Sequence, residues 1–431
     1  MKPQRIRDPI HDLISFSPRD EALWRLIQTE PVQRLRRVKQ LGFSEFVYPG
    51  ATHTRFSHVL GAMQMSRRML AAFERTDVIG PTSPDHDAKK RATIAAALLH
   101  DVGHGPYSHV FEELCETCGI EKSHEEWTFD IINNSKITQI LKEDGIFDEV
   151  TSFFQAEKLY TPYSAIISSQ LDCDRLDFLC RDRYFCGLRS SYIDLEWLFD
   201  SLLIEKVVVN LEKGIEQFSF VVHPKGLRVV EEFVISYLKM YNDVYFHKTT
   251  RAVQHMIVDV IQEIIDSGDE SKSIARNSII RFLRDEKSRD IEKYLSMDDS
   301  CIVSLIHDIS ISKNPNAANT AQRYLQRDLY KCIEIPSTED GPPNRRIKKF
   351  IDALKNEKIY HKLDYIKGRS YKQYEVADKK FLENILIKKG EEHERLHSAS
   401  KIIRSIPTQS ARIYFRTADE KSGAEKILSS L

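Results

Sequence analysis

The run LLHDVGHGPYSH, residues 98–109, constrains the fold of this chain more than any other stretch. It closes the apolar segment RATIAAALL, residues 91–99, whose alanines and leucines predict a buried helix. Imidazole fills a core poorly, but it is a good metal ligand and proton carrier. A site at the mouth of a packed helix is held rigidly, and the run places four polar side chains there: His100, Asp101, His104 and His109.

Helical periodicity dominates the rest of the chain. One shared helix face is predicted by the 3, 4, 3, 4 spacing of Val59, Ala62, Ser66, Met69 and Phe73. Residues 226–265 are also helical in character. Residues 205–223 differ, because β-branched and aromatic residues flank a glycine-containing turn, which predicts a β-hairpin. Residues 383–417 favour the order strand, turn, helix, strand.

These patterns predict a mainly α fold. We expect a helical bundle with a small β-hairpin, followed by a smaller C-terminal lobe of mixed α/β structure. The predicted division is a core over residues 1–265, a helical extension over residues 266–335 and the lobe over residues 336–431.

Composition narrows the class of protein. Of 431 residues, 41% are hydrophobic and 29% charged, with a formal net charge of −1, so nothing global indicates a nucleic-acid or membrane partner. No apolar run approaches the ~18 residues of a membrane span. The N-terminus has no apolar segment typical of a signal peptide. Seven scattered cysteines, an odd number, suit a reducing compartment, and we expect a cytoplasmic protein.

The histidines predict a metal site. Seven of fifteen fall between residues 53 and 124. Neighbouring His100 and Asp101 reach one cation only where the backbone turns sharply, and Gly103 and Gly105 favour such a turn. A divalent ion needs further ligands from other helices. The candidates are His58 and Asp174.

An acidic set also requires an explanation. Asp172, Asp174, Asp177 and Asp182 lie within an apolar helical segment, and buried carboxylates are costly unless they are paired or bind a metal. Asp177 and Asp182 have a simpler alternative, which is pairing with a nearby arginine, and we favour it for Asp177. The arginines in reach are Arg175, Arg181 and Arg183. For His53 a surface or hydrogen-bonding position is the default interpretation.

A family resemblance rests on several segments in order. They are RDPIHDLISFS (7–17), PVQRLRRVKQLG (31–42), VYPGATHTRFSHVLG (47–61), LLHDVGHGPYSHVFE (98–112), SHEEW (123–127), LDCDRLDFLCRD (171–182) and VYFHKTTR (244–251). Together they resemble the HD-domain deoxynucleoside triphosphate triphosphohydrolases, in the branch that includes the sterile-alpha-motif/HD-domain enzyme. The resemblance becomes general after about residue 255. We expect no sterile-alpha-motif domain, because the chain begins directly at the HD core.

The resemblance implies roles for individual residues. The metal ligands would be His58, His100, Asp101 and Asp174. The catalytic imidazoles would be His104, His109 and His124, with Glu112 where the family commonly has an aspartate. The substrate contacts would be Arg55 at a phosphate, Gln40 and Leu41 near the sugar, and Asp182 and Tyr245 in the nucleotide pocket. Tyr237 and Tyr241 stand where animal members carry basic or imidazole side chains.

The chemistry fits phosphoryl transfer. A divalent cation activates water and polarises a phosphoryl oxygen, and Arg55 and Lys248 would add positive charge. Mixed His and Asp ligands suit Mn, Fe, Zn, Co or Ni, whereas Mg²⁺ would bridge the substrate phosphates. His109 or His124 would protonate the leaving group. SHEEW can also be a plain helix start with Ser123 as the N-cap, and both interpretations of His124 can hold.

The resemblance implies attack at the α-phosphorus of a dNTP, releasing deoxynucleoside and triphosphate. Two other functions remain open. An HD-type nuclease or nucleotidase would share the metal site but release other products. A non-catalytic nucleotide sensor would bind metal without turnover, although every metal and imidazole position is filled.

The segment 31–42 also resembles the family region that binds an activating nucleotide between subunits. Gln33 and Arg36 match contact residues, and Arg5 lies near a position that contacts activator phosphate. Thr29 replaces an acid that would accept both donors of a guanine edge. We therefore expect a homo-oligomer, dimer or tetramer, that responds to a nucleotide activator without strict guanine selectivity. A solvated helix face or a subunit contact is the alternative for this segment. A nucleic-acid partner is possible in principle but not indicated, and no membrane partner is expected.

Overall fold

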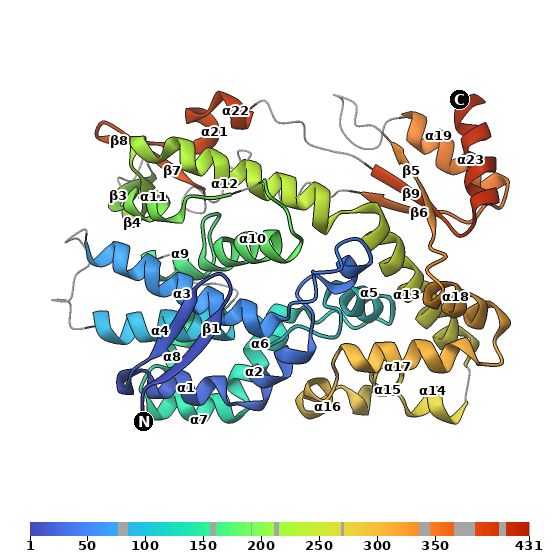
Figure 1. The fold of residues 1–431 in the computed structure, drawn as a ribbon, viewed down its shortest axis with the longest axis horizontal. Helices are drawn as coiled ribbons and strands as arrows, with labels where there is room; N and C mark the ends of the chain where they lie inside the picture. The colour runs from blue at the N-terminus through green and yellow to red at the C-terminus, as the bar shows by residue number, and fades with distance from the viewer. Residues whose placement is uncertain are drawn as a thin grey trace.

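The mainly α fold is confirmed by a computed structural model (Figure 1). It describes residues 1–75, 85–155, 161–190, 192–210, 215–268, 271–335, 345–365, 384–404 and 411–430. Blue and cyan helices form a bundle at the lower left of Figure 1, and yellow and orange helices lie at the lower right. Of the C-terminal strands, those at residues 331–335, 362–365 and 411–415 lie at the upper right, and those at residues 386–389 and 392–395 lie at the upper left.

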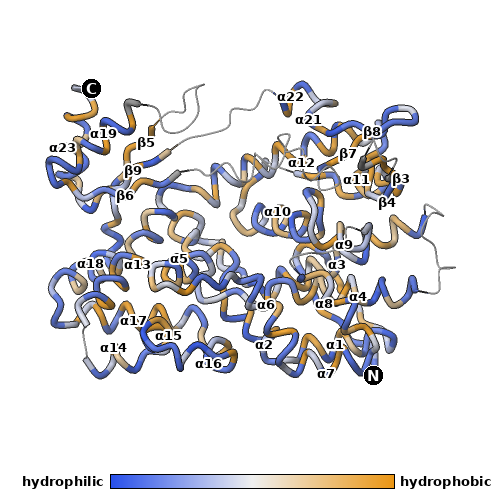
Figure 2. Tube along the Cα trace, turned by 180° about the vertical axis from the view of Figure 1, so that it is seen from behind, coloured by the Kyte–Doolittle hydropathy of each residue, from blue (hydrophilic) through white to orange (hydrophobic). Residues whose placement is uncertain are grey.

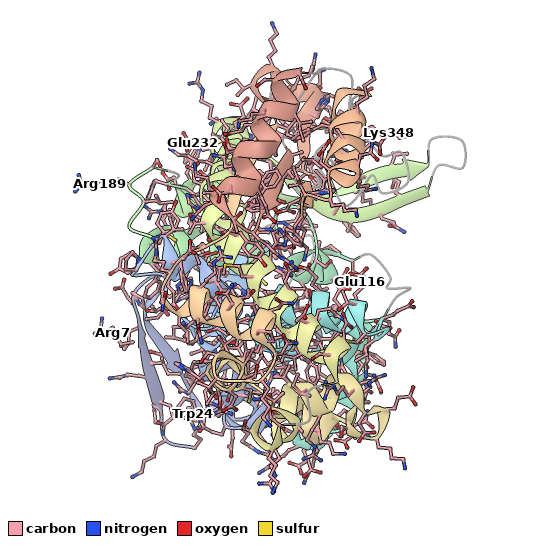
Figure 3. All side chains as sticks on the ribbon, turned by 90° about the vertical axis from the view of Figure 1, so that its right-hand side faces the viewer. Arg7, Trp24, Glu116, Arg189, Glu232 and Lys348 are labelled. Carbon is pink, nitrogen blue, oxygen red and sulfur yellow. The ribbon has the colours of Figure 1, made fainter. Side chains whose placement is uncertain are left out.

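The first part of the chain builds an N-terminal hairpin and short helices. They are β1 (Gln4–Asp8), β2 (Asp12–Phe16), η1 (Pro18–Asp20), α1 (Glu21–Ile27), α2 (Glu30–Arg34), η2 (Leu35–Arg37) and η3 (Gly42–Phe46). β1 and β2 are antiparallel, with Asp8 opposite Asp12 at the turn. Arg5 and Arg7 are exposed on β1, and Figure 3 shows Arg7 projecting away from the body of the molecule.

The bundle that follows carries the HD run. Its helices are α3 (Arg55–Glu74), α4 (His86–Leu99), α5 (His109–Thr117), α6 (His124–Asn133), α7 (Lys136–Glu143), α8 (Phe147–Ser152), α9 (Pro162–Ile167), α10 (Cys173–Phe185) and α11 (Leu195–Asp200). All five residues of the predicted face of α3 are buried. α3 packs between α4 and α10, so most of its own residues are buried. Figure 2 shows orange, hydrophobic positions in this interior part of the bundle.

The predicted hairpin is present as β3 (Leu202–Asn210) and β4 (Ile215–Val222), paired antiparallel. The helical character predicted for residues 226–265 is confirmed, but the stretch is divided into several elements. The chain forms η4 (Pro224–Gly226), α12 (Leu227–Met240), a π-helical turn η5 (Tyr241–Tyr245) and α13 (Lys248–Ser267). The chain breaks at Phe246 and His247, where the imidazole of His247 caps α13 by accepting from Thr249 N.

The next helices are α14 (Lys272–Arg276), α15 (Ser278–Arg284), η6 (Glu286–Ser288), α16 (Ile291–Leu295), α17 (Asp299–Ser310) and α18 (Pro315–Leu325). The C-terminal part holds β5 (Lys331–Ile335), α19 (Arg345–Asn356), β6 (Lys362–Tyr365), β7 (Leu386–Lys389), β8 (Glu392–Arg395), α21 (Leu396–Ala399), α22 (Lys401–Arg404), β9 (Ala411–Phe415) and α23 (Ala418–Ser430). The mixed α/β character predicted here is confirmed.

Two sheets cross the predicted boundary at residue 335. One has the order β5-β9-β6, so β5 joins strands from the predicted lobe. The other has the order β3-β4-β7-β8, with β7 parallel to β4. The helical extension, the lobe and the core therefore share sheets, and the division at residues 265 and 335 stays a prediction. Among the described helices, none has the length and apolarity needed to cross a bilayer.

Candidate metal centre and active site

Four side chains from three helices converge at the centre of the bundle. His58 lies in the first turn of α3, His100 caps the end of α4, Asp101 follows it, and Asp174 lies in the first turn of α10. His58 Nε2 is 2.9 Å from Asp174 Oδ1 and 3.3 Å from His100 Nε2. His100 Nε2 is 3.3 Å from Asp101 Oδ1. The predicted ligand set is therefore brought together.

The ring nitrogens have defined roles. His58 donates from Nδ1 to Asp177 Oδ2 at 2.9 Å, and His100 donates from Nδ1 to the Ala97 carbonyl at 2.9 Å. Each histidine thus uses Nδ1 as a donor and directs Nε2 into the cluster. This arrangement is typical of metal-binding histidines, because the outer hydrogen bond fixes the tautomer and the orientation of the ring.

The cluster favours a cation. Ligand atoms of His58, His100 and Asp101 lie within 4.8 Å of one another, which matches ligands placed about 2.0–2.2 Å around one ion. Burial lowers the pKa of His58, but hydrogen bonds to Asp174 and Asp177 outweigh burial and raise the pKa to about 10. The site therefore holds a proton tightly when it has no metal. The residues present fit a divalent ion.

Arg55 lies beside Asp101 and places a positively charged guanidinium next to the cluster. Its Nη1 donates to Asp101 Oδ2 at 2.5 Å, and its Nε donates to Ser108 Oγ at 3.0 Å. Burial raises the pKa of Asp101, but the charges of Arg55, His100 and His104 together outweigh burial and hold the pKa well below its usual range. Asp101 is therefore ionised, as a metal ligand must be.

The turn after His100 differs from the expectation. Neither Gly103 nor Gly105 has a positive φ; the left-handed residues are Tyr107 (φ 50°) and Ser108 (φ 47°). The glycines serve close packing instead, because a Cβ at Gly103 would overlap the backbone of α6 and one at Gly105 would overlap Phe111.

Contacts from α17 and its neighbours hold this turn. Asp299 accepts from Tyr107 N at 2.7 Å, and the Tyr294 hydroxyl donates to the Gly103 carbonyl at 2.5 Å. Buried Arg34 donates to the His104 carbonyl at 2.8 Å and to the Met297 carbonyl at 2.7 Å. The loop that carries His104 and Ser108 is therefore fixed from outside the bundle.

The predicted catalytic imidazoles form a second cluster beside the first. His104 Nε2 is 3.3 Å from Asp101 Oδ1, and the rings of His104 and His124 stack with centroids 4.0 Å apart and planes 16° apart. Glu112 accepts from Nδ1 of both His124 and His109. Imidazole lone pairs lie in the ring plane, so two stacked rings cannot direct them at one ion. This cluster suits proton transfer rather than a second metal.

One cavity of about 1140 Å³ connects the two clusters with the pocket residues. Its lining includes most of the predicted site: Gln40, Leu41, Arg55, His100, Asp101, His104, His109, His124, Asp174, Asp182, Tyr237, Tyr241 and Tyr245. Lys248 is exposed at the start of α13 and is not among the residues that line this cavity, so its role as a substrate contact stays a prediction. Arg175, which we did not predict as a contact, lines it instead.

The segment resembling an activator site is engaged within the chain. Gln33 donates to the Ile27 carbonyl at 2.7 Å and accepts from Arg36 Nε at 2.9 Å. The Arg36 guanidinium lies 3.6 Å over the Phe56 ring. Thr29 is buried, and its hydroxyl donates to the Leu26 carbonyl at 2.6 Å. The activator role of this segment stays a prediction.

Comparisons with known proteins address the family. A model of the HD domain matches residues 55–158, and a model of the HD-associated region matches residues 204–358. An uncharacterized protein of Mycoplasma pneumoniae is 34% identical over 360 residues, covering 81% of this chain and 77% of the relative. The chain belongs to the HD-domain family.

Two further matches of the HD-domain protein are to proteins named as phosphohydrolases. Deoxynucleoside triphosphate triphosphohydrolase SAMHD1 of Bos taurus is 25% identical over 386 residues, covering 80% of this chain and 60% of the relative. The crystal structure of a phosphohydrolase from Bacteroides thetaiotaomicron superposes with a TM-score of 0.72 at 23% identity, covering 96% of this chain and all of that chain. The latter confirms the fold.

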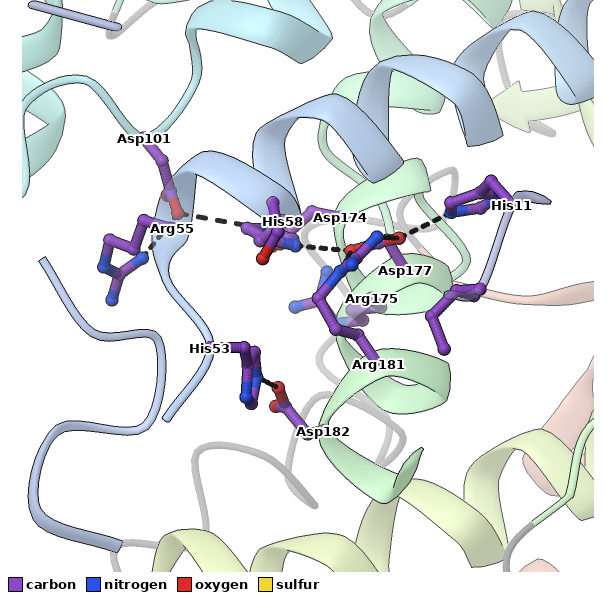
Figure 4. Close-up of polar contacts among 12 residues, drawn as sticks. His11, His53, Arg55, His58, Asp101, Asp174, Arg175, Asp177, Arg181 and Asp182 are labelled. Atoms are coloured by element: carbon purple, nitrogen blue, oxygen red, sulfur yellow. Dashed lines mark hydrogen bonds and ion pairs between the residues drawn. The ribbon is translucent and has the colours of Figure 1, made fainter. Parts of the chain in front are cut away.

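Three residues of this HD-domain site were missed or misplaced from sequence. Asp177 pairs with Arg181 as expected, but it also orients His58. His53 is buried, and its Nε2 donates to Asp182 at 2.7 Å (Figure 4), which confirms the hydrogen-bonding alternative and not the surface position. His11 donates to Asp177 from the N-terminal hairpin. A histidine in a hairpin turn gives no sequence signal for such a contact across 166 residues.

Proposed function

We propose that the HD-domain protein is a dNTP triphosphohydrolase that releases deoxynucleoside and intact triphosphate. The observation that carries the proposal is one cavity lined by three of the four candidate metal ligands, His100, Asp101 and Asp174, together with a buried arginine, imidazoles and an aromatic pocket. Its volume of about 1140 Å³ accommodates a nucleoside triphosphate. The SAMHD1 relatives, whose name states this activity, support it.

The chain's own residues would position the phosphates. A divalent ion bound by His58, His100, Asp101 and Asp174 would supply charge neutralisation and an activated water. Arg55 directs its guanidinium along the same wall of the cavity, and its bonds to Asp101 and Ser108 fix its orientation. A preorganised arginine stabilises charge on phosphoryl oxygens without reorganisation during the reaction.

The nucleoside would lie against the aromatic part of the cavity. Gln40 lines this cavity, and its Oε1 is buried without a hydrogen-bond partner among the described residues, so it is an acceptor for a sugar hydroxyl. Asp182 is held by His53 and by the Tyr245 hydroxyl at 2.8 Å. Tyr241 stacks on Phe246 and offers a flat surface near the base.

His124 is the proposed general acid. Its ring stacks on His104 next to Asp101, whereas the His109 side chain is 71% exposed and its ring centroid lies 6.4 Å from that of His104. Burial lowers the pKa of His124, but the hydrogen bond to Glu112 and the charges of Glu112 and Asp101 together outweigh burial and raise the pKa. The imidazolium therefore persists near neutral pH and is lost as pH rises through the raised pKa.

Glu112→Gln tests this assignment through the pH profile. Loss of the carboxylate should lower the pKa of His124, so the alkaline fall in kcat should move to lower pH. Because a hydrogen bond to a charged group is worth ~1.5–3 kcal/mol, kcat at pH 8 should fall at least roughly tenfold. The measurement is kcat from pH 6 to 9 at saturating dNTP. An unchanged alkaline limb would contradict the acid role of His124.

Product analysis tests the proposed reaction. Each of the four dNTPs, singly and mixed, should be incubated with Mn²⁺ or Mg²⁺ and the products separated by ion-exchange chromatography. We expect deoxynucleoside and triphosphate in equal amounts. Nucleoside monophosphate, or shortened oligonucleotides from single-stranded DNA, would support a nucleotidase or nuclease instead. A metal-loaded protein inert toward every nucleotide would support a sensor.

We also propose a homo-oligomer whose activity responds to a second nucleotide. Thr29 is buried and has no carboxylate that could accept both donors of a guanine edge. The activator should therefore not be restricted to guanine nucleotides. We expect GTP, dGTP and dATP each to raise the rate of hydrolysis of one dNTP, and the three activated rates to lie within about threefold of one another. A threefold difference corresponds to ~0.6 kcal/mol, the free energy of one weak contact. Sedimentation velocity should be recorded alongside. Activation by GTP alone, or a monomer that activators leave unchanged, would refute this.

A further inference from the structure

The turn of the N-terminal hairpin reaches the back of the metal centre. His11, in the loop between β1 and β2, donates from Nε2 to Asp177 Oδ1 at 2.7 Å, and the side chains of His11 and Asp177 are 2% and 0% exposed. Asp177 in turn accepts from His58 Nδ1. Figure 4 shows this chain of contacts running from His11 through Asp177 to His58 and Asp101.

Asp177 is fully used by these contacts. Its Oδ1 accepts from His11 and from Arg181 Nη2 at 3.0 Å, and its Oδ2 accepts from His58 and from Arg181 Nε at 2.8 Å. A carboxylate has about four acceptor positions, so all are occupied. With every position filled, the carboxylate cannot rotate without breaking a bond, and its bond to His58 is held in one direction.

The same network anchors the hairpin turn. Arg181 donates to Asp8 from Nη1 at 2.8 Å and from Nη2 at 3.2 Å. Asp8 Oδ1 also accepts from the backbone nitrogens of Ile10 and His11 at 2.9 and 3.0 Å. A closed ring of contacts therefore runs from Asp8 through Arg181 and Asp177 to His11 and back along the turn.

The packing of α3 leaves space for this ring at one position. Gly61 lies one turn after His58, and a Cβ there would overlap both Asp177 Oδ1 and the Arg181 guanidinium. The network thus fills a slot against the helix that carries a metal ligand. The carboxylates of Asp8 and Asp177 and the guanidinium of Arg181 together carry a net negative charge next to His58. This charge makes the His58 imidazole a stronger ligand for a cation.

We propose that His11 is a positioning residue for the metal: by holding Asp177 it orients His58, so docking of the hairpin turn sets the metal affinity. The inference rests on the proposed metal site but not on the identity of the substrate. A free hairpin would leave Asp177 with an open acceptor position and a rotatable carboxylate. The metal would then bind a histidine whose ring is less firmly held.

Metal affinity of the full chain tests the proposal. We would titrate Mn²⁺ or Co²⁺ alone into the purified, chelator-stripped protein by calorimetry, and record the Co²⁺ absorption spectrum. Loss of an outer-shell partner typically costs 10–100-fold in metal affinity. His11→Ala and His11→Asn, whose side chains cannot reach Asp177, should weaken binding by that factor and alter the Co²⁺ spectrum. His11→Gln, which keeps a donor near the same distance, should restore most of the affinity.

A matched control separates positioning from stability. His86 is also buried, and it bonds the Tyr163 hydroxyl at 2.7 Å and Glu74 at 3.1 Å, away from Asp177. His86→Ala should lower the melting temperature but leave the metal affinity unchanged. The proposal is overturned if folded His11→Asn binds metal as the wild type does, if His86→Ala loses as much affinity, or if the wild type binds neither ion.

The outcome is independent of the proposed dNTPase activity. If the wild type binds metal and His11→Asn weakens that binding while no dNTP is hydrolysed, the positioning role holds and the proposed function fails. If dNTPs are hydrolysed and His11→Asn retains wild-type metal affinity, the function holds and the positioning role fails.

Discussion

Asp101→Ala should abolish hydrolysis and remove bound metal together. Asp101 contacts His100 at 3.3 Å and Arg55 at 2.5 Å, so its loss removes a ligand and releases the arginine that would face the phosphates. A catalytic metal contributes several kcal/mol to transition-state stabilisation, so the rate should fall at least ~10³-fold. Metal content by mass spectrometry and turnover of dNTP should be measured on the same sample.

Asp20→Ala is the matched control for this variant. Asp20 also pairs with an arginine, Arg67, at 2.7 Å, but it lies outside the cavity lining. It should retain the wild-type rate and metal content. Full activity in Asp101→Ala would refute the assigned metal centre, and so would loss of activity with full metal retention at an unchanged fold.

His124→Ala should lose rate far more than it loses metal. His124 lies outside the ligand set, and its Nδ1 bonds Glu112, so we expect kcat to fall by ~10²–10⁴ while metal content stays near that of the wild type. Part of the SHEEW segment is structural, since Ser123 caps α6 by accepting from Glu126 N. The substitution leaves that cap intact, so the circular dichroism spectrum should not change.

His109→Ala is the comparison for the acid role. It removes an imidazole with the same partner, Glu112, from an exposed position. We expect a loss in kcat below about tenfold, because a distant, solvated imidazole transfers a proton less effectively. Equal losses in the two variants would leave the acid role unassigned to His124, and a larger loss in His109→Ala would reverse the assignment.

The sequence predicts the main helices and the convergence of the four candidate ligand residues, whose role as metal ligands stays a prediction. The buried face of α3 follows from apolar spacing alone, and the run 91–99 forms the end of α4 as its composition indicates. His58, His100, Asp101 and Asp174 converge as the family resemblance implies. These features depend on local periodicity or on short motifs, and both can be recognised in one sequence.

What the sequence could not predict depends on contacts distant along the chain. The glycines near the site favoured left-handed turns at Gly103 and Gly105, but the positive φ angles occur at Tyr107 and Ser108. Asp299, on another helix, stabilises this turn by accepting a hydrogen bond from Tyr107 N. Lys248 follows the break between η5 and α13, which the sequence did not indicate, and it is exposed at the start of α13. His11 looks like an ordinary turn residue until Asp177 is placed beside it.

Because of the strained turn, the geometry of the HD segment depends on the HD-associated segment. Each left-handed non-glycine residue costs ~1–3 kcal/mol, and a hydrogen bond to a charged group returns ~1.5–3 kcal/mol. Tyr107 and Ser108 lie within the HD match, but Tyr294 and Asp299, which keep the turn wound, lie within the HD-associated match. A fragment ending at residue 265 would keep every ligand and every imidazole yet lose this brace, and its turn would relax. Gene fusions or truncations that separate the two segments would therefore keep the ligands and imidazoles but lose the backbone geometry that positions them.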